Sequence, residues 1–220
     1  MTRHVPHLYL PPPWSGAEIP LDEGHVNHLR KVLKLAEGSD LSYTDGAGTL
    51  GSGRFSDGGV RRGPEATVAR PNGVTAVVAP PSSRDRIRFL VEKTAELGVS
   101  RLLWIRTART TGGSPRQAKA IAWATAALEQ SRGAWMMEIG TTTMGDLDPA
   151  DLVVADPGGL RQAPSDRSTL LIGPEGGLTS EEIPSGAVRL SLGPTVLRVE
   201  TAAVVGVLAL ISQPAPSPAH

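Results

Sequence analysis

The chain has 220 residues, with 22 Lys and Arg against 22 Asp and Glu, and 40% of its residues are hydrophobic. This length and composition predict a globular protein of one or two domains with a substantial core. The absence of cysteine excludes disulfides, thiolate zinc sites, iron–sulfur clusters and cysteine nucleophiles. Any chemistry must therefore use oxygen, nitrogen or main-chain groups.

No apolar stretch reaches the roughly 18 residues that a membrane span needs, and the first 13 residues lack a basic-then-apolar signal layout. We therefore expect a cytoplasmic protein with no membrane partner. The zero net charge hides an uneven distribution, because residues 84–109 carry a net charge of +4 and residues 140–182 carry −6. A nucleic-acid partner would have to be attracted by a local patch, and a solvated surface of mixed charge is the alternative.

The first 70 or so residues are predicted to form a small β-rich domain with one short basic helix. Val26, Leu29 and Leu33 recur at helical spacing, and basic residues lie off this stripe. Short strands are expected at 40–44, 53–55 and 66–69. The sequence Pro-Asn-Gly at 71–73 marks the predicted domain boundary.

From Val74 onward, strands alternate with helices, which is typical of an α/β domain. Residues 74–79 form an apolar run suited to a strand buried on both faces. The predicted helices cover residues 87–95, 114–132 and 201–211. Further strands are expected at 102–105, 152–155, 169–172 and 188–192. The proline-rich residues 214–220 are predicted to be a flexible tail.

Two apparent motifs are interpreted as structural. Residues 46–51 match G-x-G-x-x-G, but the glycines and polar residues that follow exclude the helix that a dinucleotide site requires, so a hairpin is predicted. His4 with His7, and His25 with His28, have i, i+3 spacing, but no third ligand is suggested nearby. No metal is expected.

Two glycine-containing loops follow predicted strands and are the candidate ligand site. The first runs from Leu171 through Gly173, Pro174, Gly176 and Gly177, and Thr179 with Glu182 has the spacing of a capping box. The second runs from Leu192 through Gly193 to Thr201. Glycines admit close approach of a ligand to the main chain, and strand exits at one edge of an α/β sheet form a shared pocket. A purely structural turn is the alternative.

Arg198 and Glu200 are the only charged residues between Arg189 and the C-terminus, and they stand beside an otherwise apolar helix. Either they form a structural ion pair, or they carry chemistry at the second loop.

The residues of the two glycine-containing loops resemble those of a known family. The segments LIGPEGGLTSEE at 171–182 and LGPTVLRVETAA at 192–203 are similar to the C-terminal signature of the bacterial ribosomal RNA small-subunit methyltransferase E family. VNHLRKVLKL at 26–35, the turn at 43–46, FLVEKTAELGV at 89–99 and ALEQS at 127–131 follow in the family's order. The segments 156–168 and 181–186 are shorter than in the family, which bears on the dimer contact.

The resemblance implies an N-terminal PUA-like RNA-binding β-barrel over residues 1–72 and a C-terminal α/β SPOUT domain with a trefoil knot over 73–213. It further implies a homodimer that uses S-adenosylmethionine to methylate N3 of a uridine in 16S rRNA of the small ribosomal subunit. Arg198 is expected to stabilise negative charge on a uracil carbonyl, and Glu200 either to accept the N3 proton or to fix Arg198. The expected cofactor-binding residues are Leu171, Ile172, Gly173, Pro174, Gly176, Leu192, Gly193, Leu197 and Thr201.

Basic residues near both domains are the candidate phosphate contacts, and they should make RNA binding depend on salt. They are Arg30, Lys31, Lys34, Arg84, Arg86 and Arg88. Two other functions stay open. One is a methyltransferase of the same fold that acts on tRNA or on a ribose hydroxyl, and the other is a noncatalytic RNA-binding or ribosome-assembly protein.

Overall fold

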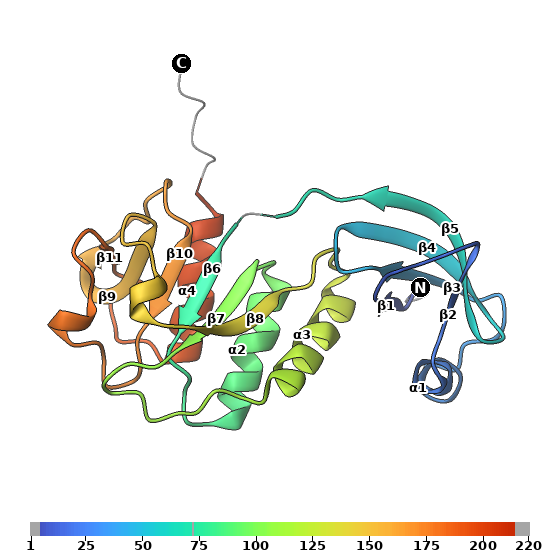
Figure 1. Cartoon of the computed structure of the whole chain (residues 1–220), viewed down its shortest axis with the longest axis horizontal. Coiled ribbons are helices and arrows are strands. Elements are labelled where there is room, and N and C mark those ends of the chain that lie inside the picture. The colour runs from blue at the N-terminus through green and yellow to red at the C-terminus, as the bar shows by residue number, and fades with distance from the viewer. Residues whose placement is uncertain (1–4, 72, 214–220) are drawn as a thin grey trace, which may run out of the picture. The chain divides into compact units, whose positions relative to one another are not determined.

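The structure is a computed structural model that describes residues 5–71 and 73–213 (Figure 1). The chain divides into two compact units, the first holding residues up to Arg70 together with Leu128–Met136, and the second holding the rest. The boundary expected after residue 72 lies two residues from this division, whereas the return of 128–136 to the first unit has no signal in the sequence. The tail expected at 214–220 lies outside the described residues.

The first unit contains a five-stranded sheet with the order β1-β3-β4-β5-β2. Only β1 and β3 are parallel. The strands β1 and β2 are the two edges and do not pair with each other, so within the described residues the sheet is open. The expected closed barrel is therefore not confirmed, since short strands separated by turns do not reveal whether the edge strands meet. The strands are β1 (His7–Tyr9), β2 (Glu18–Pro20), β3 (Asp40–Thr44), β4 (Thr49–Ser56) and β5 (Gly59–Thr67).

The predicted hairpin at 46–51 is confirmed, because β3 and β4 pair as antiparallel neighbours across it. Gly46 and Gly48 have φ angles of 70° and 106°, which glycine adopts without strain. Tyr43 is fully buried in the core of this unit, and its hydroxyl donates a hydrogen bond to Glu65 at 2.7 Å. Burial and this carboxylate raise the pKa of Tyr43 to about 12.

The predicted basic helix begins as α1 (Glu23–Asn27) and continues as a π-helical turn, η1 (His28–Val32). Asp22 caps its N-terminus by accepting a hydrogen bond from the His25 amide at 2.7 Å. Leu29 is fully buried, as expected, but Leu33 is 42% exposed. The reason is that a π-turn is wider than an α-turn, so the residues after it leave the apolar stripe.

The second unit is built on a six-stranded sheet whose strands are all parallel, in the order β11-β9-β10-β6-β7-β8. This confirms the α/β organisation. The strand β8 was not predicted. The strands are β6 (Thr75–Val78), β7 (Arg101–Ile105), β8 (Glu138–Thr142), β9 (Leu152–Leu160), β10 (Thr169–Ile172) and β11 (Val188–Leu190). The helices are α2 (Arg84–Glu96), α3 (Gln117–Ser131) and α4 (Val199–Ile211), with 3₁₀ turns η2 (Met144–Asp146) and η3 (Ser180–Glu182).

The helix α4 packs on β10 and β6 and also against α2. The close approach requires Gly206, because a Cβ atom there would lie 2.7 Å from Cδ2 of Leu170. Another cluster around Val77, Val154 and Leu171 is covered by side chains from the loops, including Leu178 and Ile183. The central strands are thus buried on both faces, as their continuous apolar sequences indicate.

A substitution at Gly51 tests the packing around Tyr43 in the core of the first unit. Gly51 pairs with Tyr43 across β3 and β4, and a Cβ atom there would lie 2.2 Å from the ring of Tyr43. We expect Gly51→Ala to lower the free energy of unfolding of this unit by about 2 kcal/mol, because the buried ring has to move. Urea titration followed by tyrosine and tryptophan fluorescence measures it. The exposed neighbour Ser52→Ala is the control, and an equal loss in both variants would contradict the assignment.

Candidate functional site

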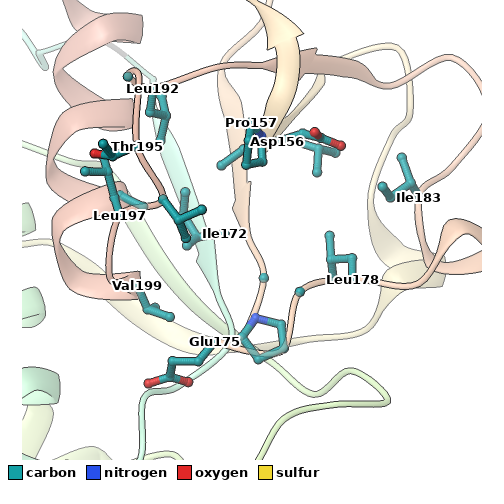
Figure 2. Close-up of a pocket in the computed structure, with 18 residues that line it drawn as sticks. Asp156, Pro157, Ile172, Glu175, Leu178, Ile183, Leu192, Thr195, Leu197 and Val199 are labelled. Atoms are coloured by element: carbon teal, nitrogen blue, oxygen red, sulfur yellow. The ribbon is translucent and has the colours of Figure 1, made fainter.

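A cavity of about 280 Å³ opens at the carboxyl ends of β9, β10 and β11. Its size is close to the lower end of the roughly 300–1,000 Å³ typical of small-molecule sites. Figure 2 shows Leu192, Thr195 and Leu197 on the side of α4, Leu178 and Ile183 on the opposite side, and Ile172 between them. Both glycine loops predicted from the sequence line this one cavity.

Six of the nine expected cofactor-binding residues line the cavity, and three do not. The lining residues are Ile172, Gly173, Pro174, Leu192, Gly193 and Leu197. Leu171 is instead fully buried in the core, and Thr201 is exposed on α4 away from the lining. Gly176 lies on the outer side of its loop, where its carbonyl accepts a hydrogen bond from the Arg109 guanidinium at 2.8 Å.

The first glycine loop is held in place by its own cap and by the loop after β7. The predicted capping box is confirmed, since the Thr179 amide donates to Glu182 at 2.9 Å and the reciprocal bond is also present. The other carboxylate oxygen of Glu182 accepts a hydrogen bond from the Ala108 amide at 2.6 Å. These two N–H donors hold the pKa of Glu182 below its usual value. The loop is therefore preorganised.

The second glycine loop leaves main-chain donors free at the cavity. Within the described residues, the amides of Gly193 and Leu197 donate to no other protein group. A Cβ atom added at Gly193 would meet nothing within 4 Å, so this glycine faces open space. The loop can therefore present N–H groups to a ligand at short range, as the sequence led us to expect.

Sequence reasoning missed residues in the middle of β9, where its pairing with β11 is interrupted. Asp156 and Pro157 line the cavity. Asp156 forms an ion pair with Arg189 at 3.0 Å and accepts a hydrogen bond from the Gly158 amide at 2.8 Å. The available signal was positional, because Asp156 directly follows a predicted strand whose exit lies at the same edge of the sheet.

Glu200 is a buried carboxylate in the first turn of α4, with only 8% of the residue exposed. Its Oε1 lies 3.7 Å from Nε of Arg86. Nη1 of the same arginine lies 3.7 Å from Oε1 of Glu175 in the first glycine loop. The second oxygen of Glu200 is buried without a hydrogen-bond partner. Arg86 thus connects the helix after one glycine loop to the other glycine loop.

Arg198 is the N-cap residue of α4, and its side chain is exposed. Among the described residues no ion pair joins it to Glu200, and Arg86 takes that place. Its guanidinium is therefore unpaired within the described residues. Arg198 itself is not a lining residue of the cavity, although its neighbours Leu197 and Val199 are.

The structure places the expected phosphate contacts in different settings. Lys31, Lys34 and Arg84 are exposed. Arg30 is paired with Asp57 and lies over the ring of Phe55. Arg88 pairs with Glu92 at 2.7 Å, and Arg86 belongs to the cluster with Glu175 and Glu200.

Residues 5–71 and 73–213 contain neither a cluster of metal-ligand side chains nor a helix that could span a membrane. No group of three or more His, Asp or Glu side chains there has a geometry that would hold a metal ion. None of the helices in those ranges is long and apolar enough to cross a membrane.

The buried cluster gives a direct test. Arg86→Met should lower the free energy of unfolding by about 2 kcal/mol, because it leaves the buried carboxylate of Glu200 without a partner. The expected loss is smaller than for a fully buried pair because Arg86 is partly exposed to water. Chemical denaturation measures the change. Adding Glu200→Gln to this variant should restore most of the loss, since the unpaired charge is removed.

Glu175→Gln is the matched control, because it removes the outer carboxylate of the cluster and leaves Arg86 beside Glu200. Its cost should stay within about 0.5 kcal/mol, as for other partly exposed pairs. A double variant no more stable than Arg86→Met alone would show that the ion pair does not explain the loss.

Comparison with known proteins places this geometry in a family. A structure of ribosomal RNA small subunit methyltransferase E from Neisseria gonorrhoeae, bound to S-adenosyl methionine, superposes with a TM-score of 0.78 at 24% identity, covering 94% of this chain and 96% of that one. A Legionella pneumophila protein described as a methyltransferase, in complex with the same cofactor, gives 0.79 at 23% identity, with 94% and 97% covered. A predicted RNA methyltransferase from Thermotoga maritima gives 0.74 at 25% identity, with 93% and 97% covered.

The family model described as an RNA methyltransferase domain matches residues 69–212, which is 144 of the 220 residues. The matched region contains the parallel sheet, both glycine loops and α4. The resemblance noted in the sequence is thus confirmed, and the chain belongs to the RNA methyltransferase domain family.

Proposed function

We propose that this protein transfers a methyl group from S-adenosylmethionine to N3 of a uridine in 16S rRNA of the small ribosomal subunit. The observation that carries the proposal is that the two glycine loops line the same cavity, in a chain of the RNA methyltransferase domain family. The cofactor-bound structures of similar fold from Neisseria gonorrhoeae and Legionella pneumophila support the choice of donor.

The residues present fit such a cofactor. Ile172, Leu178 and Leu197 provide apolar walls for an adenine ring. The free amides of Gly193 and Leu197 are donors for the nitrogen and oxygen atoms of a nucleoside. Asp156 places a carboxylate at the cavity, where it can accept hydrogen bonds from hydroxyl or ammonium groups.

When bound, the cofactor supplies a sulfonium methyl group, whose bond to sulfur breaks as the bond to N3 forms, leaving a neutral thioether. The uracil N3–H is a weak acid that is mostly protonated at neutral pH, so its proton has to leave as the new bond forms. The task of the protein is to hold methyl, sulfur and N3 in line and to accommodate the charge that develops.

Arg198 is the residue we assign to the developing charge. Its exposed guanidinium at the N-cap of α4 can donate hydrogen bonds to a uracil carbonyl as that oxygen becomes negative. Glu200 lies two residues further on. Within the described residues its carboxylate pairs with Arg86 and not with Arg198, so of its two expected roles we propose acceptance of the N3 proton, by the oxygen that has no hydrogen-bond partner. Its Oε1 lies 3.7 Å from the Arg86 guanidinium.

The proposal extends to the fold and assembly that the family resemblance implies. We infer a trefoil-knotted SPOUT domain, a PUA-like N-terminal domain that binds RNA, and a cytoplasmic homodimer. The position of β10, inserted between the earlier strands β6 and β9, supports the knotted topology. The shortened segments 156–168 and 181–186 bear on the dimer contact and leave both glycine loops intact.

The activity is tested by incubating the purified protein with S-adenosylmethionine and either small ribosomal subunits or 16S rRNA. Nuclease digestion and mass spectrometry then identify and locate the modified nucleoside. We expect N3-methyluridine at one site. Methylation of a ribose hydroxyl or of tRNA alone would overturn the assigned substrate, and the absence of cofactor binding in calorimetry would favour a noncatalytic RNA-binding protein.

Arg198→Ala should lower turnover by about 100-fold, because a donor to the developing charge is removed, while cofactor affinity stays nearly unchanged. Steady-state kinetics and calorimetry measure the two quantities. The exposed Arg161→Ala is the control and should change neither. An equal loss of turnover and of cofactor affinity in Arg198→Ala would argue against this role.

Gly193→Leu should weaken cofactor binding by about 10-fold or more without destabilising the fold, as expected when a side chain fills space that the ligand needs. The added side chain meets no protein atom near the main chain. Gly113→Leu is the matched control, because a side chain there also meets nothing within 4 Å and Gly113 lies outside the cavity lining. Calorimetry with S-adenosylmethionine and thermal unfolding distinguish the two effects, and equal affinities for both variants would sink the assignment of the cavity.

A further inference from the structure

The segment between Glu96 and Glu129 contains five basic residues and no acidic residue. Arg101 stands at the amino end of β7, and the other four follow its carboxyl end in the loop and first turn that lead into α3. These four residues are Arg106, Arg109, Arg116 and Lys119. Because the sheet is parallel, they lie at the same edge as the exits of β9, β10 and β11, where the cavity opens.

In Figure 1 the green segment between β7 and α3 runs along the lower edge of the second sheet, at the end where α2 begins. We call residues 106–119 the basic loop. Its residues are not among the RNA contacts expected from the sequence, although residues 106–109 belong to the basic stretch 84–109.

The basic loop is attached directly to the first glycine loop. The Arg109 guanidinium donates to the Gly176 carbonyl at 2.8 Å, and the Ala108 amide donates to Glu182 at 2.6 Å. Any group that binds to the basic loop is therefore held beside the cavity.

The basic loop is also fixed internally. The Thr107 amide donates to the Thr110 hydroxyl at 2.9 Å, and the Thr110 amide donates to the Thr107 carbonyl at 3.1 Å. Gly112 is buried against the residues that follow β6, so closely that a Cβ atom there would lie 2.1 Å from the Pro80 carbonyl oxygen. Such a preorganised loop loses little conformational entropy when a ligand binds.

The cations of this loop are not neutralised within the protein. Among the described residues, Arg106 and Arg116 form no ion pair, and both are exposed. Lys119 likewise has no acidic partner there and lies 5.8 Å from the ring centre of Trp123. In contrast, Arg86 and Arg88 are both engaged by carboxylates.

We propose that the basic loop binds the phosphodiester backbone of the RNA substrate beside the cavity, with Arg106 and Arg116 as phosphate contacts. The inference rests on the proposed function for the identity of the RNA. Guanidinium groups suit phosphate oxygens because they donate two parallel hydrogen bonds. Arg109 fixes the loop to Gly176 and has a positioning role. Backbone contacts at this place would set the target nucleotide at the mouth of the cavity, and they carry no base specificity.

The test measures the affinity for a 16S rRNA transcript over a series of salt concentrations. Removing one cation that binds a phosphate should reduce the slope of log affinity against log salt by about 1. We therefore expect Arg106→Ala and Arg116→Ala each to lower the slope by about 1, and the double variant by about 2. Affinity for S-adenosylmethionine, measured by calorimetry, should stay unchanged.

Arg101→Ala is the matched control. Arg101 is the first residue of β7, whereas Arg106 directly follows the last residue of that strand, so the two arginines lie at opposite ends of it. Its salt slope should equal that of the unchanged protein. An unchanged slope in the double variant, or an equal decrease in Arg101→Ala, would overturn the proposal.

The two measurements separate the RNA surface from the proposed activity. A protein that binds the transcript with the expected decrease of slope, yet produces no N3-methyluridine, would retain the RNA surface and lose the proposed activity. A protein that methylates the transcript with no change of slope in the double variant would retain the activity and lose the surface.

Discussion

The site depends on the common direction of the strands in the second sheet. The strand β9 lies between β10 and β11, and Val154 pairs with Leu171 on one side and with Arg189 on the other. The chain therefore leaves β10 and β11 at about the same level, on either side of the end of β9. This arrangement forces the two glycine loops to face each other across that end, and the cavity is the space between them.

A buried ion cluster stabilises that arrangement. Helix α4 is almost entirely apolar, so a carboxylate in its first turn has a high desolvation cost unless a cation lies close to it. Arg86 provides this cation from α2, and it reaches Glu175 in the first glycine loop as well. The same guanidinium thus links α4, which follows the second glycine loop, to the first glycine loop. The second oxygen of Glu200 has no hydrogen-bond partner within the described residues, so Arg86 satisfies only part of this carboxylate.

The predictable part of the fold is the part in which local pattern and tertiary environment agree. The strands at 75–78 and 169–172 are continuous apolar runs because both of their faces are buried. The strand at 138–142 was missed because it lies at an edge and its Thr and Gly residues give no apolar period. The 3₁₀ turn at 180–182 and the π-turn at 28–32 show the same limit, because hydrogen-bond register within a short helix has no clear sequence signal.

Ion pairs between residues close in the sequence could be predicted, whereas pairs between distant residues could not. The pair Arg88–Glu92 is an i, i+4 pair that the sequence already contains, whereas the partners of Arg86 lie 89 and 114 residues away (175 − 86 and 200 − 86) and become visible only in the fold. The sequence alone does not distinguish a paired arginine from an unpaired one, and of Arg84, Arg86 and Arg88 the last two pair with carboxylates. A cation can attract a polyanion only if its field is not already cancelled at short range. The run without acidic residues between Glu96 and Glu129 contains arginines whose charge no carboxylate cancels among the described residues, and the proposed phosphate contacts rest on this difference.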